Sequence, residues 1–233
     1  MKKGKFKRFI KIIKEKKLEV LVAVFLGLTT LLVAWAGWIG SLHGGIQAIN
    51  FTKSNNLAAK GNSEYNVAAQ VYISDLFTWN TISGLQLDEE IAKENGNKNE
   101  AKTIEAKIEK IKQSSCSPRL LEAISNADLQ GKSPFENEEF VNGYFEEAKK
   151  LLDESQNTLE EGKQDNLRGD SYRLVSVLYS LVLFLLGIVG VIKDHHSRKS
   201  LFIFSVFILV LAIVYMITIP LPTGFNITSF FNF

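Results

Sequence analysis

Three uninterrupted apolar runs dominate the pattern of hydrophobic and polar positions along the chain. They cover approximately Leu18–Ser41, Leu174–Ile192 and Leu201–Pro220, and the only charged residue within them is Glu19, near the start of the first run. A helix needs about 20 residues to cross the hydrocarbon core of a bilayer, and a surface helix of a soluble protein would keep a polar stripe. The pattern therefore predicts three transmembrane helices.

The segment between the first and second runs has the period of amphipathic helices. Tyr65, Tyr72 and Trp79 recur every seven residues. The expected boundaries are loops at Asn95–Asn97 and Asn126–Ser133, helix starts at Ser117-Pro118 and at the capping box Ser133-Pro134-Phe135-Glu136, and a helix end at Gly162. No alternating run is long enough to predict a sheet. The expected fold class is an all-α membrane protein, with an extracytoplasmic helical hairpin or bundle between the first and second spans, whose first and last helices continue from the spans.

Charge is strongly segregated along the chain. Residues 1–17 contain nine Lys or Arg and one Glu, residues 42–172 have a net charge of −8, and residues 193–199 have a net charge of +2. Basic segments that flank spans face the cytoplasm, so we expect a cell-membrane protein with its N-terminus inside and its C-terminus outside. The expected parts are a basic cytoplasmic N-terminus (1–17), transmembrane helix 1 (18–41), an extracytoplasmic helical domain (42–172), transmembrane helix 2 (173–192), a cytoplasmic loop (193–199), transmembrane helix 3 (200–220) and an extracytoplasmic tail (221–233).

Two alternatives concern the N-terminal segment. Ala34-Trp35-Ala36 matches a signal-peptide cleavage pattern, but the apolar stretch before it is longer than an ordinary signal-peptide core, so an uncleaved signal anchor is expected. Phe and Ile residues lie among the basic residues of segment 1–17. This segment therefore either lies on anionic lipid as an amphipathic helix or simply continues the first span.

The stretch AWAGWIGSLHGGIQA, residues 34–48, is rich in small residues for the exit of a span. On a helix it forms two rows of small residues: Ala36, Gly40, Gly44 and Ala48, and beside them Gly37, Ser41 and Gly45. Small residues on one face let two helix backbones approach closely. The stretch therefore predicts tight helix packing, with Gly40 and Gly44 at the contact. A flexible hinge at the membrane exit is the alternative.

The chain resembles a family of uncharacterised bacterial three-span membrane proteins with an outer helical domain. Members read AW-x-G-Y-Q-A-A-R-W-G-G-x-Q-A near the exit of the first span, and the matches here are Ala34, Trp35, Gly37, Gly44, Gly45, Gln47 and Ala48. The family's D, F and W in its first outer helix resemble Asp75, Phe77 and Trp79, and its GD-x-Y-x-L entry to the second span is similar to Gly169-Asp170-Ser171-Tyr172-Arg173-Leu174. The resemblance implies the architecture and supplies no activity.

This sequence departs from the family pattern at Ile39, Leu42, His43 and Ile46, and so lacks the Arg and Glu that the family carries on this face. The packing and motif residues expected to matter are Trp35, Gly37, Gly40, Gly44, Gly45, Gln47, Asp75, Trp79, Gly169, Asp170 and Tyr172.

The sequence contains no recognisable catalytic or cofactor motif. Its single cysteine, Cys116, has no internal disulfide partner, and His195-His196 fall short of the three or four ligands of a zinc site. Phosphate-binding, zincin and nucleophile-elbow patterns are absent, and His43 is expected to have an interfacial or packing role. We therefore expect no enzyme activity, cofactor or metal. Nucleic-acid binding is disfavoured because the strongly basic tract belongs beside the membrane.

Two functions from different classes remain. The first is a non-enzymatic interaction or sensing protein, which would bind an envelope or protein partner through its outer helical domain. The alternative is a homo-oligomeric ion channel or pore, for which Thr29-Thr30 is the main polar feature within a span. A proton-coupled transporter is disfavoured because the spans lack internal charged groups. The lipid bilayer is the partner that the sequence specifies most directly.

Overall fold

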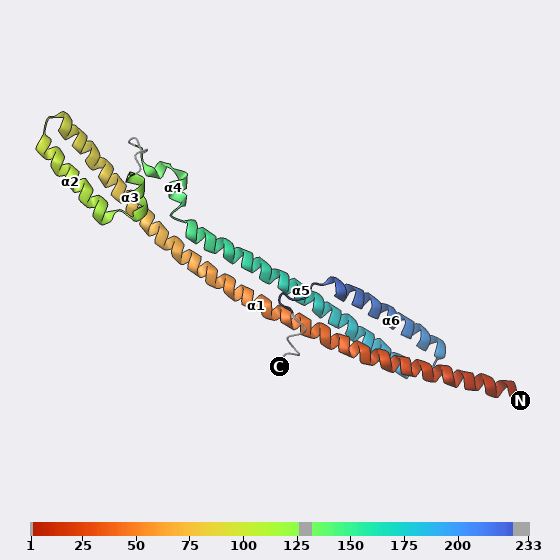
Figure 1. The fold of residues 1–233 in the computed structure, drawn as a ribbon. Coiled ribbons are helices and arrows are strands. Elements are labelled where there is room, and N and C mark those ends of the chain that lie inside the picture. The colour runs from red at the N-terminus through yellow and green to blue at the C-terminus, as the bar shows by residue number, and fades with distance from the viewer. Residues whose placement is uncertain (1, 126–131, 226–233) are drawn as a thin grey trace. The chain divides into compact units, whose positions relative to one another are not determined.

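The computed structural model describes residues 2–125 and 132–225, with side chains described from Lys17 onward, and this part of the chain is helical (Figure 1). In chain order its elements are α1 (Lys2–Glu94), α2 (Lys98–Ser115), α3 (Pro118–Ser125), the 3-10 turn η2 (Pro134–Glu136), α4 (Glu138–Asn142), α5 (Glu146–Val191) and α6 (His195–Thr218). No strand occurs in these residues. The predicted all-helical class is therefore confirmed for the described part of the chain.

Three of the helices are long and apolar enough to cross a membrane, by their length and composition. The apolar segments lie in α1, α5 and α6, as the three apolar runs predicted. A short turn joins α5 to α6, and the carboxylate of Asp194 caps α6 by accepting a hydrogen bond from the Ser197 backbone N–H at 2.8 Å. This hydrogen bond lowers the pKa of Asp194, because it stabilises the ionised carboxylate.

Two helices are much longer than a span. α1 has 93 residues and α5 has 46 residues. The chain divides into two compact units, which we call unit 1 (residues 1–52 and 158–233) and unit 2 (residues 53–157). Both long helices continue without a break from one unit into the other, so the helices that flank the segment between the first two apolar runs do continue from those runs.

In unit 1, α1, α5 and α6 pack against one another along one stripe of each helix. The buried positions of α5 recur at three- and four-residue spacing: Tyr172, Val175, Tyr179, Val182, Leu186 and Val189. α1 contributes Ala36 and Ile39 to the same core, and α6 contributes Leu209 and Ala212. In lipid such a stripe is stabilised mainly by close van der Waals contact, since lipid tails are as apolar as the side chains.

The backbones of α1 and α5 approach closely at Gly40 and Gly169. A Cβ atom on Gly40 would lie 3.2 Å from Cβ of Tyr172 and 3.5 Å from the carbonyl oxygen of Gly169. Gly44 belongs to the same row of small residues, but a Cβ atom there would meet nothing within 4 Å. The reason is that residues four apart drift by about 40° around a helix, so the row turns away from α5 after Gly40. The tight contact therefore lies at Gly40, whereas a side chain at Gly44 would have room.

Gly162 lies inside α5 and does not end a helix there, which corrects the sequence expectation. A Cβ atom on Gly162 would lie 2.6 Å from ring carbons of Phe51 and 3.3 Å from Cβ of Asn50. The glycine thus makes room for side chains of α1. This packing outweighs the weak helix propensity of glycine, which costs about 1 kcal/mol relative to alanine.

Unit 2 contains a helical hairpin formed by the end of α1 and by α2 (Figure 1). The buried residues between the two helices are Ile82, Ala92, Ala101, Ile104 and Ile108. The chain turns between the helices at Gly96, whose φ of +78° is a left-handed conformation that glycine adopts without strain. The loop expected at Asn95–Asn97 is therefore present.

The chain between α2 and α5 is more broken than the sequence indicated. α3 begins after Ser117, as expected, but the capping box at Ser133 opens only the short turn η2, where the Phe135 N–H donates to the Ser133 hydroxyl oxygen at 3.3 Å. The side chain of Asn137 then caps α4 by accepting hydrogen bonds from two backbone N–H groups. This local bonding competes with a continuous helix, so the helix expected from Pro134 is divided into η2, α4 and α5. Residues 126–131 of the expected loop lie outside the described residues.

α1 and α5 also pair within unit 2. The buried residues Ser54 and Ser155 exchange hydrogen bonds, because each hydroxyl donates to the backbone carbonyl oxygen of the other residue, at 2.9 and 2.8 Å. A Cβ atom on Gly61 would lie 2.9 Å from Cγ of Leu152. Small residues therefore allow the two helices to lie close together in this unit as well.

Gly40→Leu is expected to destabilise the protein, because Tyr172 and Gly169 leave no room for a larger side chain. Overpacking of this kind typically costs about 1–3 kcal/mol. Gly44→Leu is the matched control from the same row, and we expect it to be neutral or slightly stabilising, since leucine has a better helix propensity than glycine. Thermal melting of the two purified variants in detergent, followed by circular dichroism, measures the difference. A lower melting temperature for the Gly44 variant than for the Gly40 variant would contradict this assignment.

Candidate functional site

The carboxylate of Asp75 is the centre of a buried polar cluster in unit 2. Asp75 is 1% exposed and accepts a hydrogen bond from the Ser117 N–H at 2.9 Å, one from the Tyr144 hydroxyl at 2.8 Å, and a third from the Ser117 hydroxyl. Three donors compensate an ionised carboxylate for its removal from water. The cluster therefore joins α1 to the start of α3 and to the residues before α5.

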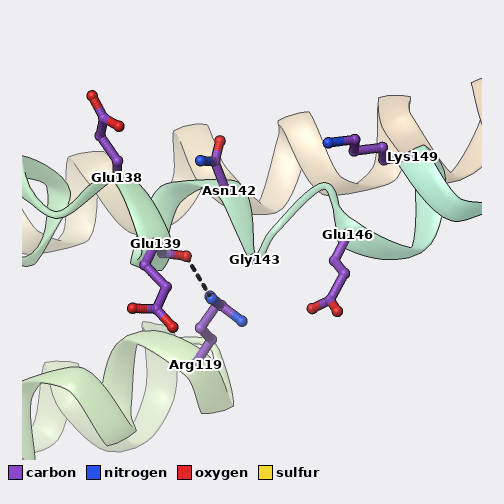
Figure 2. Close-up of a pocket in the computed structure, with 7 residues that line it drawn as sticks. All are labelled: Arg119, Glu138, Glu139, Asn142, Gly143, Glu146 and Lys149. Atoms are coloured by element: carbon purple, nitrogen blue, oxygen red, sulfur yellow. Dashed lines mark hydrogen bonds between the residues drawn. The ribbon is translucent and has the colours of Figure 1, made fainter.

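Arg119 lies beside this cluster, and its guanidinium is held by backbone carbonyls and aromatic rings. Nε donates to the carbonyl oxygen of Phe140 at 3.0 Å. Nη2 donates to the carbonyl oxygen of Glu139 at 3.4 Å, and Figure 2 shows this second hydrogen bond. The guanidinium carbon lies 5.4 and 5.3 Å from the ring centroids of Phe140 and Tyr144, within the range of cation–π attraction. A Cβ atom on Gly143 would lie 1.6 Å from Nη2, so the glycine leaves the space that Arg119 occupies.

A hollow of about 650 Å³ opens next to Arg119. It is lined by Arg119, Glu138, Glu139, Asn142, Gly143, Glu146 and Lys149 (Figure 2). Its three glutamates are exposed, and Nε and Nη2 of Arg119 already donate to carbonyl oxygens. In the part of the chain that the structure describes, no group of three or more His, Cys, Asp or Glu residues could hold a metal ion. We therefore regard the hollow as a solvated depression of the surface.

The surroundings of Asp75 favour the protonated forms of the Tyr144 hydroxyl and the Cys116 thiol. Burial raises the pKa of the Tyr144 hydroxyl, and its hydrogen bond to Asp75 raises that pKa further. Burial, followed by the charge of Asp75, raises the pKa of the Cys116 thiol. A reactive cysteine needs a lowered pKa, so Cys116 is not placed to act as a nucleophile.

A second buried polar cluster lies between α1 and α5 in unit 1. The side chain of His43 is fully buried, and its Nδ1 lies 2.8 Å from Oδ1 of Asp165, which is 4% exposed. Nε2 of His43 lies 3.2 Å from the carbonyl oxygen of Pro220. The ring of Tyr172 stacks on the imidazole with centroids 5.8 Å apart, and its hydroxyl donates to the carbonyl oxygen of Ile219 at 3.3 Å. His43 of α1 and Tyr172 of α5 thus contact the carbonyl oxygens of Pro220 and Ile219, the two residues that follow Thr218, the last residue of α6.

An exposed row of apolar residues runs along α1 in unit 2, and we call it the α1 apolar face. It consists of Ile73, Phe77, Leu87 and Ile91, whose exposed fractions are 49, 67, 58 and 47%, together with Asn80 and Gly84 between them. The spacing alternates between four and three residues, as in a coiled-coil seam. At 100° per residue the six positions fall within an arc of about 80°, so they form one stripe.

Exposed acidic residues border the C-terminal half of the α1 apolar face. By helix geometry, Asp88 lies on one side of Leu87 and Ile91, and Glu90 and Glu94 lie on the other side. An apolar seam with acidic borders is therefore available on the surface of unit 2.

The structure brings together some of the motif residues that the sequence indicated. Gly40, Gly169 and Tyr172 meet where α1 contacts α5, and Trp35 lies nearby on α1 with its ring centroid 6.2 Å from that of Phe225. Asp75 and Trp79 are buried in unit 2.

The remaining motif residues do not join that contact. Gly37 and Gly45 are exposed, Gly44 and Gln47 are half-buried, and Asp170 is exposed and pairs with Arg173 at 2.7 Å. The motif therefore combines residues at the contact between α1 and α5 with residues that face away from it.

Sequence reasoning did not identify Asp165, Ser117, Tyr144 or Arg119 as members of buried clusters. Asp165 is 122 positions from His43 along the chain, and helix periodicity alone does not pair such distant residues. One signal was present, because Asp165, Gly169 and Tyr172 continue the buried stripe of α5 at four- and three-residue spacing. A carboxylate on a packing stripe needs a polar partner.

Comparison with known proteins adds no assignment. No protein family, curated protein or solved structure matches the chain.

Asp75→Asn is expected to destabilise unit 2 by about 1–3 kcal/mol, because an amide NH₂ group would replace an oxygen that accepts hydrogen bonds. Tyr144→Phe removes a single donor and should cost about 1 kcal/mol. Asp88→Asn is the control, since Asp88 is exposed on the same helix; we expect a change within about 0.5 kcal/mol. Denaturant unfolding of the full chain in detergent measures all three. Equal stabilities of the Asp75 and Asp88 variants would show that the cluster does not stabilise the fold.

The raised pKa of Tyr144 predicts a loss of stability in alkali. In the unfolded chain this tyrosine deprotonates near pH 10, its ordinary pKa, whereas the folded chain keeps the proton to higher pH. The stabilisation is therefore present below about pH 10 and is lost as the pH rises through the folded-state pKa. Between about pH 9 and 11 the melting temperature of Tyr144→Phe should fall less than that of the parent, both in a Cys116→Ser background. An equal fall in both proteins would argue against this role.

Proposed function

We propose that this chain is a non-enzymatic membrane protein that uses unit 2 as an interaction module outside the membrane and docks a helix of a partner protein on the α1 apolar face. The observation that carries the proposal is the row of exposed apolar residues at coiled-coil spacing. Membrane insertion of the three apolar helices would hold the module at the membrane surface.

The α1 apolar face is not used by the fold of unit 2. The buried residues of the hairpin, such as Ile82 and Ala92, lie on another side of α1, while Phe77 and Leu87 keep 67 and 58% of their surface exposed. Single exposed apolar residues are common in proteins. A row of them at this spacing is typical of a surface that docks an amphipathic helix, and the polar Asn80 within the row would favour one register of docking.

The acidic borders of the face favour a basic partner. Asp88, Glu90 and Glu94 are exposed beside the seam, so charge complementarity selects a helix that carries Lys or Arg next to its apolar residues. A second copy of this chain in the same membrane would bring a second set of carboxylates to the same level. Repulsion between these like charges disfavours self-association.

The charge pattern supports an orientation in which unit 2 lies outside the cell membrane. Residues 1–17 and 193–199 are the basic segments that flank the apolar helices, and such segments remain in the cytoplasm. Unit 2 is connected to the opposite end of the first span, and the last span would leave the C-terminus outside. An interaction module in this position would reach partners in the envelope.

A homo-oligomeric pore is the other function that the sequence raised. The hydroxyls of Thr29, Thr30, Ser176, Ser180 and Ser205 each donate to the carbonyl oxygen four residues earlier in the same helix. The donors of these hydroxyls are therefore already used within their own helices, which favours a packing role over the lining of a polar path. The interaction module is the better-supported proposal.

Two synthetic helical peptides test the proposed docking. Both carry leucine at alternating four- and three-residue spacing; one has lysine beside the leucines and the other has glutamate. The full-length protein is placed in nanodiscs of zwitterionic lipid. We expect it to bind the lysine peptide at least about tenfold more tightly than the glutamate peptide, a difference of about 1.4 kcal/mol in binding free energy. Fluorescence anisotropy of the labelled peptides measures both affinities.

Variants of the face separate docking from attachment of the peptide to lipid. Leu87→Gln combined with Ile91→Gln should weaken the lysine peptide at least about tenfold, whereas Leu121→Gln, at an apolar residue of α3 that is 39% exposed, should leave it unchanged. Equal binding of both peptides, or unchanged binding to the double variant, would contradict the proposal. If the chain instead forms a dimer that is lost in the double variant, the α1 apolar face binds a second copy of the chain and not a partner helix.

A further inference from the structure

We propose that His43 and Asp165 form a proton-binding site, and that the bound proton holds the segment following α6 against α1 and α5. The ligand is a single proton, exchanged with water at the end of the first span. This inference concerns unit 1 and does not depend on partner docking at the α1 apolar face.

The hydrogen-bond partners of His43 require one proton more than a neutral histidine and an ionised aspartate provide. Nδ1 lies 2.8 Å from Oδ1 of Asp165, and Nε2 lies 3.2 Å from the carbonyl oxygen of Pro220. A carbonyl oxygen and an ionised carboxylate only accept hydrogen bonds, whereas a neutral imidazole has a single N–H group. With that set of protons, one ring nitrogen would point its lone pair at an oxygen lone pair.

One added proton satisfies both contacts. In the first arrangement His43 is an imidazolium and donates from both ring nitrogens to the ionised Asp165 and to Pro220. In the second, Asp165 is a carboxylic acid that donates to Nδ1, and Nε2–H of a neutral His43 donates to Pro220. Both arrangements contain the same number of protons, and both are compatible with burial because the pair is neutral overall.

The charged and titratable groups around the pair are few. On α5, Nη1 of Arg168 lies 3.8 Å from Oδ1 of Asp165, and Tyr172 stacks on the imidazole. The sequence of α1 contains no charged residue between Glu19 and Lys53, and residues 201–225 contain Tyr215 as their only ionisable side chain. Arg168 favours the ionised carboxylate, so the imidazolium arrangement is the one we expect.

The proton would control the segment after α6 through Pro220. The hydroxyl of Tyr172 contacts the carbonyl oxygen of Ile219, and Nε2 of His43 contacts the carbonyl oxygen of Pro220. The ring of Phe225 lies against Trp35 and Trp38, with ring centroids 6.2 and 5.7 Å apart. When the proton leaves, the remaining N–H stays with Asp165, because a hydrogen bond to a carboxylate is stronger than one to a neutral carbonyl. Nε2 then presents a lone pair to Pro220 and repels it.

The direction of the pH dependence follows from the proton count. A free histidine loses its proton near pH 6.5, so above this pH the folded site binds one proton more than the unfolded chain. The equilibrium constant for unfolding should therefore rise about tenfold per pH unit above about pH 6.5, for as long as the folded site keeps its proton.

Nitrogen-15 NMR of the histidine ring tests the proton count directly. The chain contains three histidines, so His195→Gln and His196→Gln leave His43 as the sole signal. At about pH 7.5 we expect both ring nitrogens to be protonated, or Nε2 to be protonated beside a carboxylic acid at Asp165, which the carbon-13 shift of that carboxyl reports. A neutral imidazole beside an ionised Asp165 would overturn the proposal.

Asp165→Asn provides a matched second test, because the amide NH₂ group can donate to Nδ1 without an added proton. In this variant Nε2–H should still bind Pro220, and the tenfold rise in the unfolding constant per pH unit should disappear. Asp170→Asn is the control, since Asp170 is exposed and pairs with Arg173; it should keep the parent's pH dependence. The same pH dependence in Asp165→Asn as in the parent would refute the site. If Asp165→Asn does not fold, the NMR measurement decides alone.

Discussion

The contact between α1 and α5 at Gly40 and Gly169 is the constraint on which unit 1 depends. A Cβ atom on Gly40 would lie 3.2 Å from Cβ of Tyr172, closer than an ordinary van der Waals contact, whereas one on Gly169 would be in ordinary contact with the carbonyl oxygen of Gly40 at 3.4 Å. The helices therefore lie this close mainly because Gly40 has no side chain. The short separation brings His43 to Asp165 and places the ring of Tyr172 on the imidazole. These side chains in turn hold the carbonyls that follow α6. The absence of a side chain at Gly40 thus contributes both to the packing of the helices and to the position of a buried polar pair.

Apolar residues are exposed in two different ways along the helices. In the spans of α1, α5 and α6, exposed apolar side chains surround the packed stripe, as a surrounding bilayer would require. Within unit 2 the large exposed residues of α1 include a narrow stripe from Ile73 to Ile91, whose C-terminal half has acidic borders. Lipid can cover a helix on all its free sides, whereas a docked helix covers one side. This difference is the reason for assigning the stripe in unit 2 to a protein partner.

The sequence was sufficient where a local rule governs the structure. Bilayer thickness sets the length of an apolar run, so three helices able to span a membrane were predictable, and Asn95–Asn97 marked the turn at Gly96. The partners of His43 and Asp75 were not predictable, because periodicity shows which residues share a face but not which helix covers it. Gly162 illustrates the same limit: a glycine within a helical pattern can end the helix or admit a neighbour, and only the position of Phe51 distinguishes the two cases.

Membrane topology is the most direct test of the central claim, that unit 2 is displayed outside the membrane while the turn before α6 stays in the cytoplasm. Single cysteines placed by Lys98→Cys or Ser197→Cys in a Cys116→Ser background can be treated with a membrane-impermeant maleimide. The account predicts that the cysteine at position 98 reacts in intact cells, and that the cysteine at position 197 reacts only after the membrane is permeabilised. Labelling in the opposite pattern would contradict it.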